Sequence, residues 1–456
     1  MNAMKLFLIS ILILFSLTSS AREVIPDDDG PEQQEEVMPN MPEGAPASIT
    51  APNPPPAEPV VKAPPGSVTF QPAAPSAKWT PSDYSNQKQA LGWGPDVFKV
   101  PPSMEDRVEF WKDIYTKYTS DQGILHDSKY ITIVYEGIDF SDITNNKDLT
   151  DKQKEKARRK RVDEKKKEVA KRLKHLQEVK DGSKLEGDDR RYWELLANVD
   201  EPRKFVEAAG RKRLRFQLGQ RNQFAAGIYM SGRYIRQMEE IFRQEGLPIE
   251  LTRLPFVESS FNLRARSKVG ATGLWQFMRT SARYYMRMDS SADERNDPLR
   301  ASRAAAKKLR DNYEMLHSWP LAITAYNRGA SGVRRLVEKL GTTDIAEIVD
   351  VRKGRFGFAG ANFYANFLAA LDVEHNADKY FGVLEVLPEL RGADILMAKP
   401  QSAKEFLKWF NNDMGMAQLL NPHISESVWK GKAPLQRKQI LRVPLLQENE
   451  ARGALE

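Results

Sequence analysis

A mainly α-helical fold is predicted by three features of this 456-residue sequence. Apolar residues recur every three or four positions in much of the chain after residue 103, which is the period of a helix with one buried face. Residues that start and stop helices, such as Asp297–Pro298 and Gly246, separate these stretches. The clearest strand character is confined to residues 130–138. These features predict helices with one or two strands.

The first 21 residues have the pattern of an export signal. Lys5 supplies a positive charge, residues 6–17 are almost entirely apolar, and the small residues Ser19 and Ala21 suit cleavage after Ala21. An uncleaved anchor is the alternative, but this run spans only about 18 Å as a helix, against roughly 30 Å of hydrocarbon core. We therefore expect a signal peptide over residues 1–21, a location in the periplasm or cell envelope, and membrane contact that is at most peripheral.

Residues 22–81 have the composition of a disordered linker. Fifteen of the 28 prolines fall within them. Between Glu23 and Glu58 the acidic residues have no Lys or Arg among them. Such a segment buries too little apolar surface to offset the conformational entropy lost on ordering. We expect an extended, Pro-rich acidic tether that lets the folded part reach away from a membrane.

Residues 82–210 are expected to form a helical, highly charged accessory region. A helical apolar pattern begins at Ser103, and residues 130–138 predict one strand. Residues 150–179 combine runs of Lys and Arg with one narrow apolar stripe, consisting of Val162, Val169, Leu173 and Leu176. This pattern predicts a long helix. Its basic surface would attract an anionic wall polymer, lipid headgroups or nucleic acid, but a solvated face partly balanced by acidic neighbours is the simpler interpretation.

Composition excludes several kinds of site. The chain has no cysteine, which rules out disulfides, thiol chemistry, Cys-ligated zinc and a lipid anchor on cysteine. Its five histidines are scattered without the spacing of metal ligands, so we expect no metal site and no cofactor. The formal net charge is +7, and acidic residues are concentrated in the linker. The folded part is therefore basic, which favours an anionic partner.

Residues 211–385 are predicted to form an all-α domain. Ser231 is a candidate cap for a helix that stops at Gly246, and Pro248 opens the next helix. The pair Asp297–Pro298 opens another one. No internal repeat, glycine-rich phosphate loop or nucleophile elbow is visible here. We therefore expect the chemistry of the domain at the joints between helices.

Glu258 is the most informative residue at these joints. It follows the apolar run Leu254–Val257 near the expected end of the helix opened by Pro248. Apolar surroundings and the negative end of the helix dipole both raise the pKa of a carboxyl. A carboxyl that stays protonated near neutral pH suits general-acid catalysis on an acetal, because the leaving sugar oxygen must take up a proton. Taken alone, the residue is more simply interpreted as an ordinary glutamate exposed to water at a helix end.

The residues around and after Glu258 follow a pattern with fixed spacing. It consists of Glu258–Asn262, Ala265, Ser267, Gly270, Ala271, Gly273–Gln276, Met278 and, further on, Tyr326 and Asn327 in the string AYNRG. This pattern resembles the lytic transglycosylases of bacterial cell walls, and most closely the membrane-bound lytic murein transglycosylase D type. The strings EEIFRQEGLPIEL and DERNDP resemble the same subfamily. The resemblance covers about residues 215–385 and implies a lysozyme-like, soluble lytic transglycosylase domain over residues 211–385.

Carried over position by position, the resemblance implies the site residues. Glu258 would be the sole catalytic acid and base. Ser267 would polarise the N-acetyl group of the substrate or hold the environment of the glutamate, and Gln276 would hydrogen-bond a sugar in the groove. Tyr326 and Asn327 would complete the wall around Glu258, with the tyrosine hydroxyl within reach of the carboxyl.

Tyr364 is the last substrate-binding residue that the resemblance implies. It lies in the string NFYANFLAAL, where the family has a tyrosine opening its last helix. The Glu-Thr pair that the family carries a few residues earlier is missing, and Arg279 stands where the family usually has proline. Gly270 and Gly273 have a plain physical interpretation besides, since glycine lets a backbone turn tightly and approach a ligand.

The number of carboxylates near Glu258 bears on the mechanism. Retaining and inverting glycosidases of the usual kind need a second Asp or Glu, yet none occurs between Glu258 and Asp289. Together with the resemblance, this implies that one glutamate cleaves the β-1,4 bond between N-acetylmuramic acid and N-acetylglucosamine. The N-acetyl group would support the cationic centre, and a 1,6-anhydromuramoyl end would form without water.

Residues 386–456 resemble the tail that follows the catalytic domain in this subfamily. A Leu-Asn-Pro turn at residues 420–422 precedes a short expected strand that ends at Val443–Pro444. The segment is similar to a lysin-motif sugar-binding module, although a complete repeat is not visible. Packing on the catalytic domain is the alternative.

Three functions are compatible with these features. The first is a peptidoglycan lytic transglycosylase, the second is a hydrolytic goose-type lysozyme of the same fold, and the third is a non-catalytic cell-wall-binding scaffold protein. The expected partners are peptidoglycan glycan strands and other envelope proteins, with no nucleic acid. Product analysis separates the first two functions, and the intact set of site residues opposes the third.

Overall fold

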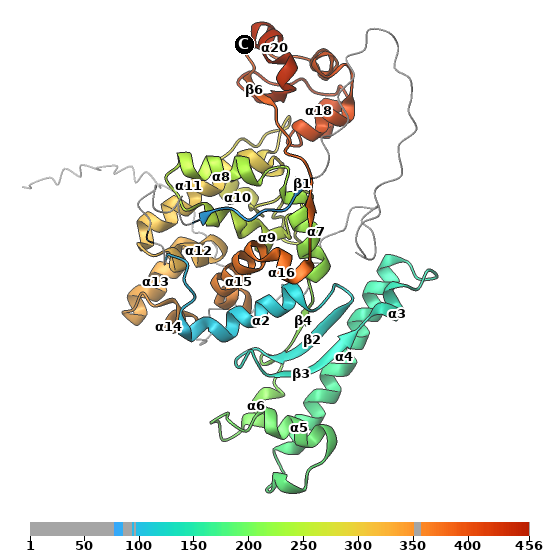
Figure 1. Ribbon diagram of the computed structural model, residues 1–456, viewed down its shortest axis with the longest axis vertical. Helices are drawn as coiled ribbons and strands as arrows, with labels where there is room; N and C mark the ends of the chain where they lie inside the picture. Colours follow the sequence, from blue (N-terminus) through green and yellow to red (C-terminus); the bar gives the residue numbers. More distant parts are fainter. Residues whose placement is uncertain (1–76, 85–93, 95–96, 351–356, 456) are drawn as a thin grey trace, which may run out of the picture.

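The computed structural model of the chain describes residues 77–84, 94, 97–350 and 357–455. The expected signal peptide and most of the expected linker lie outside these residues. Figure 1 shows helices through most of the described chain, with a small sheet beside α4 and a separate group of elements at the C-terminal end. The prediction of a mainly α-helical fold is confirmed. No helix within the described residues is both long and apolar enough to cross a membrane.

The central body is a bundle of helices around one large apolar core. Its elements are α7 (Arg221–Ser231), α8 (Ile235–Gln244), η3 (Ile249–Arg253), α9 (Leu254–Ser259), α10 (Arg279–Ala282), η4 (Glu294–Asn296), α11 (Pro298–Leu316), α12 (Trp319–Arg328), α13 (Ala330–Leu340), α14 (Ile345–Asp350), α15 (Phe358–His375) and α16 (Ala377–Phe381). Asp297 accepts hydrogen bonds from two backbone N–H groups of the first turn of α11, which begins with Pro298. The helix start predicted at these two residues is confirmed.

The helix cap predicted at Ser231 is wrong. Ser231 is the last residue of α7, and its hydroxyl donates to the carbonyl oxygen of Ile228, 2.7 Å away. The serine belongs to α7 because the apolar residues Phe224 and Ile228 bury this preceding helix in the core, and the punctuation of the sequence does not reveal it. The end of α8 agrees with the prediction, since Gly246 follows it with a φ of 69°.

The first long helix of the expected accessory region packs in the central core. α2 (Glu105–Thr116) follows a 3-10 turn, η1 (Pro102–Met104), and packs against α15. Its buried side chains are Arg107, Val108, Phe110, Trp111, Ile114 and Tyr115. The boundary expected at residue 210 therefore does not coincide with the edge of this core, because the apolar face of α2 is buried by the bundle.

The segment before α2 is also tied to the central body. β1 (Ala77–Lys78) pairs antiparallel with β5 (Glu385–Val386). The Tyr84 hydroxyl donates to the Glu374 carboxylate of α15 at 2.9 Å. Residues 77–84, which precede α2, are thus held on the bundle as well.

A small antiparallel sheet and α4 (Asp151–Leu176) form a second unit. The strands β2 (Gln122–Asp127), β3 (Val134–Asp139) and β4 (Leu214–Leu218) lie in the order β3-β2-β4. The remaining elements of this unit are α3 (Ser141–Thr144), η2 (Gly182–Lys184), α5 (Gly187–Leu195) and α6 (Lys204–Ala208). The apolar stripe of α4 joins the sheet in a second buried cluster. The long helix and the strand predicted within residues 130–138 are confirmed.

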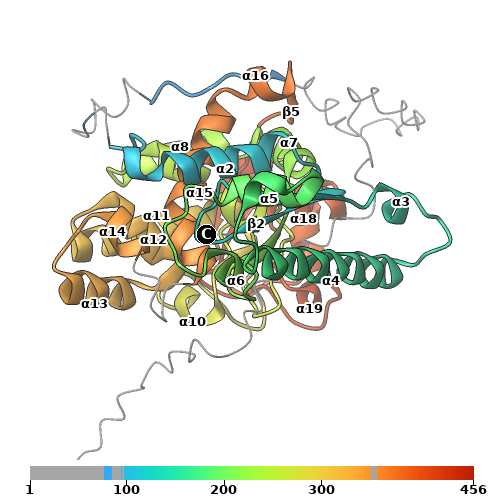
Figure 2. The same cartoon turned by 90° about the horizontal axis from the view of Figure 1, so that it is seen from below.

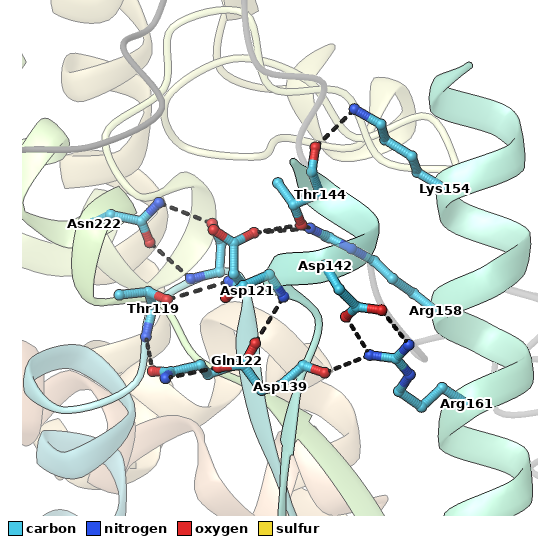
Figure 3. A network of polar contacts seen from close by, with 12 residues as sticks. Thr119, Asp121, Gln122, Asp139, Asp142, Thr144, Lys154, Arg158, Arg161 and Asn222 are labelled. Atoms are coloured by element: carbon cyan, nitrogen blue, oxygen red, sulfur yellow. Dashed lines mark hydrogen bonds and ion pairs between the residues drawn. The ribbon is translucent and has the colours of Figure 1, made fainter. Parts of the chain in front are cut away.

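Charged side chains fasten α4 to the rest of this unit (Figure 3). The Arg161 guanidinium donates to both oxygens of Asp142 at 2.6 and 2.7 Å, and Arg158 donates to Asp121 at 2.8 Å. The Lys154 ammonium donates to the carbonyl of Thr144 at 2.8 Å. Figure 2 shows α4 extending as one long helix away from the central helices toward α3. One side of α4 is thus fastened, while its opposite side is exposed.

The C-terminal residues form a folded module with its own apolar cluster. Its elements are β6 (Ala393–Leu396), α17 (Ala403–Leu407), η5 (Lys408–Phe410), α18 (Met414–Leu420), α19 (Glu426–Trp429), β7 (Ile440–Val443), η6 (Leu445–Gln447) and α20 (Glu448–Leu455). The strands β6 and β7 pair antiparallel, with the helices α17 to α19 between them in sequence. The backbone of the module bonds to the central body, for example from Asp293 N–H to the His423 carbonyl at 2.8 Å.

Candidate active site

Glu258 lies next to the end of a very short helix. α9 contains six residues, and Ser260 ends it with a φ of 49°. Leu254 and Phe256 on the inner side of α9 are fully buried, whereas Glu258 is only partly buried. Glu258 therefore lies at the edge of the core.

The environment of this carboxyl favours its protonated form. Burial raises the pKa of Glu258 from 4.5 to about 7, and the positive charge of Lys308 opposes that rise. With the described residues the Glu258 carboxyl makes no hydrogen bond and no ion pair. The carboxyl can therefore exist in either protonation state near neutral pH, as general acid–base chemistry requires.

The loop after α9 is folded tightly by two glycines. Gly270 and Gly273 have φ values of 91° and 78°, in a region that favours glycine. The Gly273 N–H donates to the carbonyl of Ala265 at 2.9 Å, which closes the loop. The Ser259 hydroxyl on α9 donates to the carbonyl of Leu274 at 2.8 Å. The loop is thereby attached to the helix that carries Glu258.

Trp275 anchors the far end of this loop in the core. Its indole N–H donates to the Ser302 hydroxyl of α11 at 2.9 Å, and its ring stacks on Phe242 of α8 at 5.7 Å between centroids. Both contacts lie deep in the bundle, where Trp275 is fully buried. The position of the neighbouring residue Gln276 is therefore set by the core.

Ser267 and Gln276 both belong to this loop. The Ser267 oxygen accepts a hydrogen bond from the Ala271 N–H at 2.9 Å. The Gln276 amide donates to the carbonyls of Gly273 at 2.7 Å and Ala265 at 3.2 Å. Both side chains are partly buried. The loop contacts engage the amide nitrogen of Gln276 as donor and the Ser267 oxygen as acceptor, so the glutamine can offer its Oε1 and the serine its hydroxyl proton to a ligand.

Tyr326 approaches Glu258, but its hydroxyl is bound elsewhere. Burial, and to a lesser extent the nearby charge of Glu258, raises the pKa of Tyr326 well above its usual value. Its hydroxyl donates to the carbonyl of Trp275 at 3.0 Å. The hydroxyl that we expected within reach of the carboxyl thus donates its proton to a backbone carbonyl. Tyr326 lies beside the acid and uses its proton to hold the glycine loop.

Asn327 and Tyr364 are placed differently from Tyr326. Asn327 lies at the exposed end of α12. Tyr364 of α15 is 1% exposed, with its ring 6.4 Å from that of Phe367. Burial alone raises the pKa of Tyr364 above its usual value, without a contribution from the charge of Glu258. Neither side chain makes a hydrogen bond with the Glu258 carboxyl in the described part of the chain.

Two residues that the sequence did not single out complete the surroundings of Glu258. Lys308 of α11 acts on the carboxyl through its charge. Tyr115 of α2 is buried, its hydroxyl donates to the Asn366 side chain of α15, and the charge of Glu258 contributes to raising its pKa. In the sequence, Lys308 stands three positions after Ala305, which places it near the buried side of α11. This spacing was the only sign that Lys308 could face the interior. Nothing in the local sequence linked Tyr115 to Glu258.

The donors around Glu258 do not suit a metal ion. The neighbouring groups that interact with its charge are an ammonium and two phenols. No group of three or more His, Asp or Glu within the described chain is placed to hold a metal. The arrangement provides one carboxyl for proton transfer.

Residues 236–349 match the family model of the transglycosylase SLT domain. The chain is 31% identical over 98 residues to the membrane-bound lytic murein transglycosylase D of Escherichia coli strain K12, which covers 21% of this chain and 22% of that protein. It is 35% identical over 103 residues to a putative tributyltin chloride resistance protein of Alteromonas sp. strain M-1, which covers 21% of this chain and 48% of that protein. The chain thus spans less than half the length of either relative.

A solved structure is also similar, that of the 70 kDa soluble lytic transglycosylase of Escherichia coli. The TM-score is 0.24 and the identity 20%, over 42% of this chain and 29% of that one. The resemblance found in the sequence is confirmed by the family model and the relatives, and residues 236–349 are the part that matches the transglycosylase SLT domain. This range contains Glu258 and Lys308, whereas Tyr115 and Tyr364 lie outside it.

Proposed function

We propose that this chain is a peptidoglycan lytic transglycosylase, a carbon–oxygen lyase that cleaves the β-1,4 bond between N-acetylmuramic acid and N-acetylglucosamine. The observation that carries the proposal is the single, partly buried Glu258 carboxyl, with a pKa of about 7, inside a transglycosylase SLT domain. A group with this pKa can donate a proton and then recover it near neutral pH.

The absence of a carboxylate partner supports a mechanism with one glutamate. Retaining and inverting glycosidases place a second carboxyl about 5 to 9.5 Å from the first. Among the described residues, the charged neighbour that shifts the pKa of Glu258 is Lys308, and no carboxylate contributes. In the proposed reaction, accordingly, no second acid activates water or attacks the sugar.

The proposed reaction has two proton transfers. Protonated Glu258 donates its proton to the glycosidic oxygen, the bond to the muramoyl C1 breaks, and the N-acetyl group of the same sugar supports the cationic centre. The Glu258 carboxylate then takes the proton of the muramoyl 6-hydroxyl as that oxygen bonds to C1. The products are a free 4-hydroxyl on N-acetylglucosamine and a 1,6-anhydromuramoyl end, and no water is consumed.

The remaining site residues have binding roles in this proposal. Ser267 donates its hydroxyl proton to the N-acetyl group, and Gln276 offers its amide oxygen to a sugar hydroxyl in the groove. Tyr326 forms the wall beside Glu258 and holds the loop of Trp275. Asn327 and Tyr364 stay substrate-binding candidates that rest on the resemblance.

The experiment that tests this function is mass spectrometry of peptidoglycan digested by the purified chain. Anhydromuramoyl products, lighter by one water than reducing-end products, are expected from the wild type and not from Glu258→Gln. Reducing ends would instead identify a goose-type hydrolytic lysozyme. Binding without any cleavage would identify a scaffold protein, and either result would overturn the proposal.

Location and partners follow from the same proposal. The substrate is found outside the cytoplasm, so the chain would be exported, with cleavage after Ala21, to the periplasm or cell envelope. Its partners would be peptidoglycan glycan strands and other envelope proteins. We also propose that the C-terminal module binds glycan in the manner of a lysin motif. Its two antiparallel strands with intervening helices support this proposal.

A further inference from the structure

Lys308 is held in an unusual position for a lysine. Its ammonium donates to the backbone carbonyl of Tyr326 at 2.9 Å and lies 3.9 Å from the centroid of the Tyr326 ring. The ring of Phe277 is 5.4 Å away. Ala305 and Leu309, which flank it on α11, are fully buried, so the helix carries the lysine stem inward. The charged end is thus fixed between two aromatic rings of the site.

This ammonium has no carboxylate within ion-pair distance among the described residues. Burial lowers the pKa of Lys308 to about 8, and the charge of Glu258 opposes that decrease. A positive charge that is partly removed from water without an acidic partner is costly. A negative charge on the nearby Glu258 carboxyl would offset this cost whenever the carboxyl is ionised.

Hydrogen bonds tie the helix that carries Lys308 to the helix that carries Glu258. Lys308 bonds to Tyr326, and the Tyr326 hydroxyl bonds to the carbonyl of Trp275. The neighbouring carbonyl, that of Leu274, accepts from Ser259, the residue after Glu258. These contacts connect α11, α12, the glycine loop and α9 through atoms with fixed positions.

We propose that Lys308 is a positioning residue that stabilises the Glu258 carboxylate between its two proton transfers. The inference rests on the proposed function, because only there does the acid pass through a charged state during each turnover. Before the first transfer the carboxyl is neutral and the lysine has no charge to balance. After it, the ammonium faces a carboxylate, and this attraction lowers the energy of the intermediate stage.

Within residues 77–84, 94, 97–350 and 357–455, no other group that interacts with the charge of Glu258 can take this role. The titratable side chains that interact with the charge of Glu258 in the described part of the chain come from three helices: Tyr115 of α2, Lys308 of α11 and Tyr326 of α12. The pKa values of both tyrosines are raised, so the phenols stay neutral at physiological pH. Lys308 is therefore the positive charge available to the carboxylate.

The direct test is titration of Glu258 by NMR of a protein with ¹³C-labelled glutamate, without substrate. Lys308→Met and Lys308→Gln both remove the charge, and the glutamine can still donate to the Tyr326 carbonyl, which guards against a folding defect in the methionine variant. Both variants should shift the Glu258 midpoint upward by about half a unit to one unit. Lys307→Met, at the exposed neighbouring position, should leave the midpoint unchanged.

Activity against pH is the second readout. In both charge-removing variants the cleavage rate should fall about tenfold, and the high-pH decline of the rate should move upward with the Glu258 midpoint. Lys308→Arg, which keeps the charge, should restore most of the rate. Equal midpoints in Lys308→Gln and wild type would overturn the inference, even if peptidoglycan is cleaved. A shifted midpoint without any cleavage by the wild type would overturn the proposed function instead.

Discussion

A side chain at Gly273 would overlap the backbone carbonyl oxygen of Arg295. The loop of Gly273 is pressed against the turn that precedes α11, and its φ of 78° is in a region that favours glycine. Gly270, three residues earlier, has a φ of 91° but open space where a Cβ atom would stand. Glycine is therefore required at position 273 by close packing, and at position 270 by the backbone conformation alone.

Gly273→Ala should consequently destabilise the protein far more than Gly270→Ala. A strained φ alone costs on the order of 1–3 kcal/mol, which we expect for Gly270→Ala. At Gly273 the backbone must move in addition, so the loss should exceed about 3 kcal/mol. Urea unfolding of both variants measures the difference. Equal losses would show that the Arg295 turn yields easily and does not constrain the loop.

Glu258→Gln should abolish cleavage with the fold intact, because the amide has nearly the same shape but cannot donate and recover a proton. Loss of general acid–base catalysis typically costs about 10²- to 10⁴-fold in rate, and one residue here serves both steps. Turnover of peptidoglycan is the measurement. Glu240→Gln, at an exposed position of α8, is the control. Substantial turnover by Glu258→Gln would mean that another carboxyl performs the reaction.

The same substitution should change how stability depends on pH. The pKa of Glu258 is raised on folding from 4.5 to about 7, so the folded state resists ionisation. Below about pH 4.5 the carboxyl is protonated in both states, and the wild type and Glu258→Gln should be about equally stable. As pH rises to 7, the wild type should lose up to roughly 3 kcal/mol relative to the variant. Urea unfolding at pH 4, 6 and 8 measures this. If the free energies of unfolding of the wild type and the variant change with pH in the same way, the carboxyl is ionised as easily in the folded protein as in the unfolded one.

The position of Glu258 could be predicted from sequence because its determinants are local. The apolar run before it forms α9, and the glycines after it turn the loop, all within 20 residues. The long helix α4 was predictable for the same reason, since its apolar stripe and the cap at Thr150 are local features. The cap predicted at Ser231 is wrong because serine also suits the last turn of a preceding helix, where its hydroxyl bonds to Ile228.

The rest of the site depends on contacts between distant parts of the chain. Tyr115 lies 143 positions before Glu258 in the sequence and reaches it because α2 packs on α15. Lys308 of α11 lies beside Tyr326 of α12 because these two helices pack against each other in the bundle. The hydroxyl of Tyr326 is bound to Trp275, a geometry that no spacing pattern encodes. Helical periodicity identifies which face is buried but not which helix will bury it.

The packing of α2 leads to a prediction about fragments. A fragment of residues 211–385 lacks the apolar face of α2, which includes Phe110, Trp111 and Ile114. Each such side chain contributes about 1.5–3 kcal/mol on burial, and the total is comparable to the 5–15 kcal/mol that holds a typical domain together. We expect this fragment to unfold without cooperativity, whereas residues 97–385 should unfold in one transition. Near-ultraviolet circular dichroism during heating measures this, and equal cooperativity would place the domain boundary at residue 210.

The outer face of α4 carries the last prediction. Four exposed lysines, Lys156, Lys167, Lys171 and Lys174, recur at helical spacing and make no hydrogen bond or ion pair with the described residues. Lys165 differs, because its ammonium lies 2.7 Å from the Glu168 carboxylate. Unpaired lysines on one face can attract an anionic polymer, whereas a lysine together with its glutamate partner contributes little net field.

Replacing the four unpaired lysines of α4 by Gln should therefore weaken retention of the protein on intact sacculi several-fold at about 0.01 M salt, where charges act over roughly 30 Å. At about 1 M salt this range shrinks to roughly 3 Å, and the difference should vanish. The double variant Lys165→Gln with Glu168→Gln is the control, because it removes a pair with no net charge, and it should bind like the wild type. Turnover of short soluble muropeptides should stay unchanged in all variants, because α4 packs in a different cluster from the site. Unchanged retention at low salt would mean that this face is merely solvated, and a loss of turnover on short substrates would mean that α4 reaches the groove.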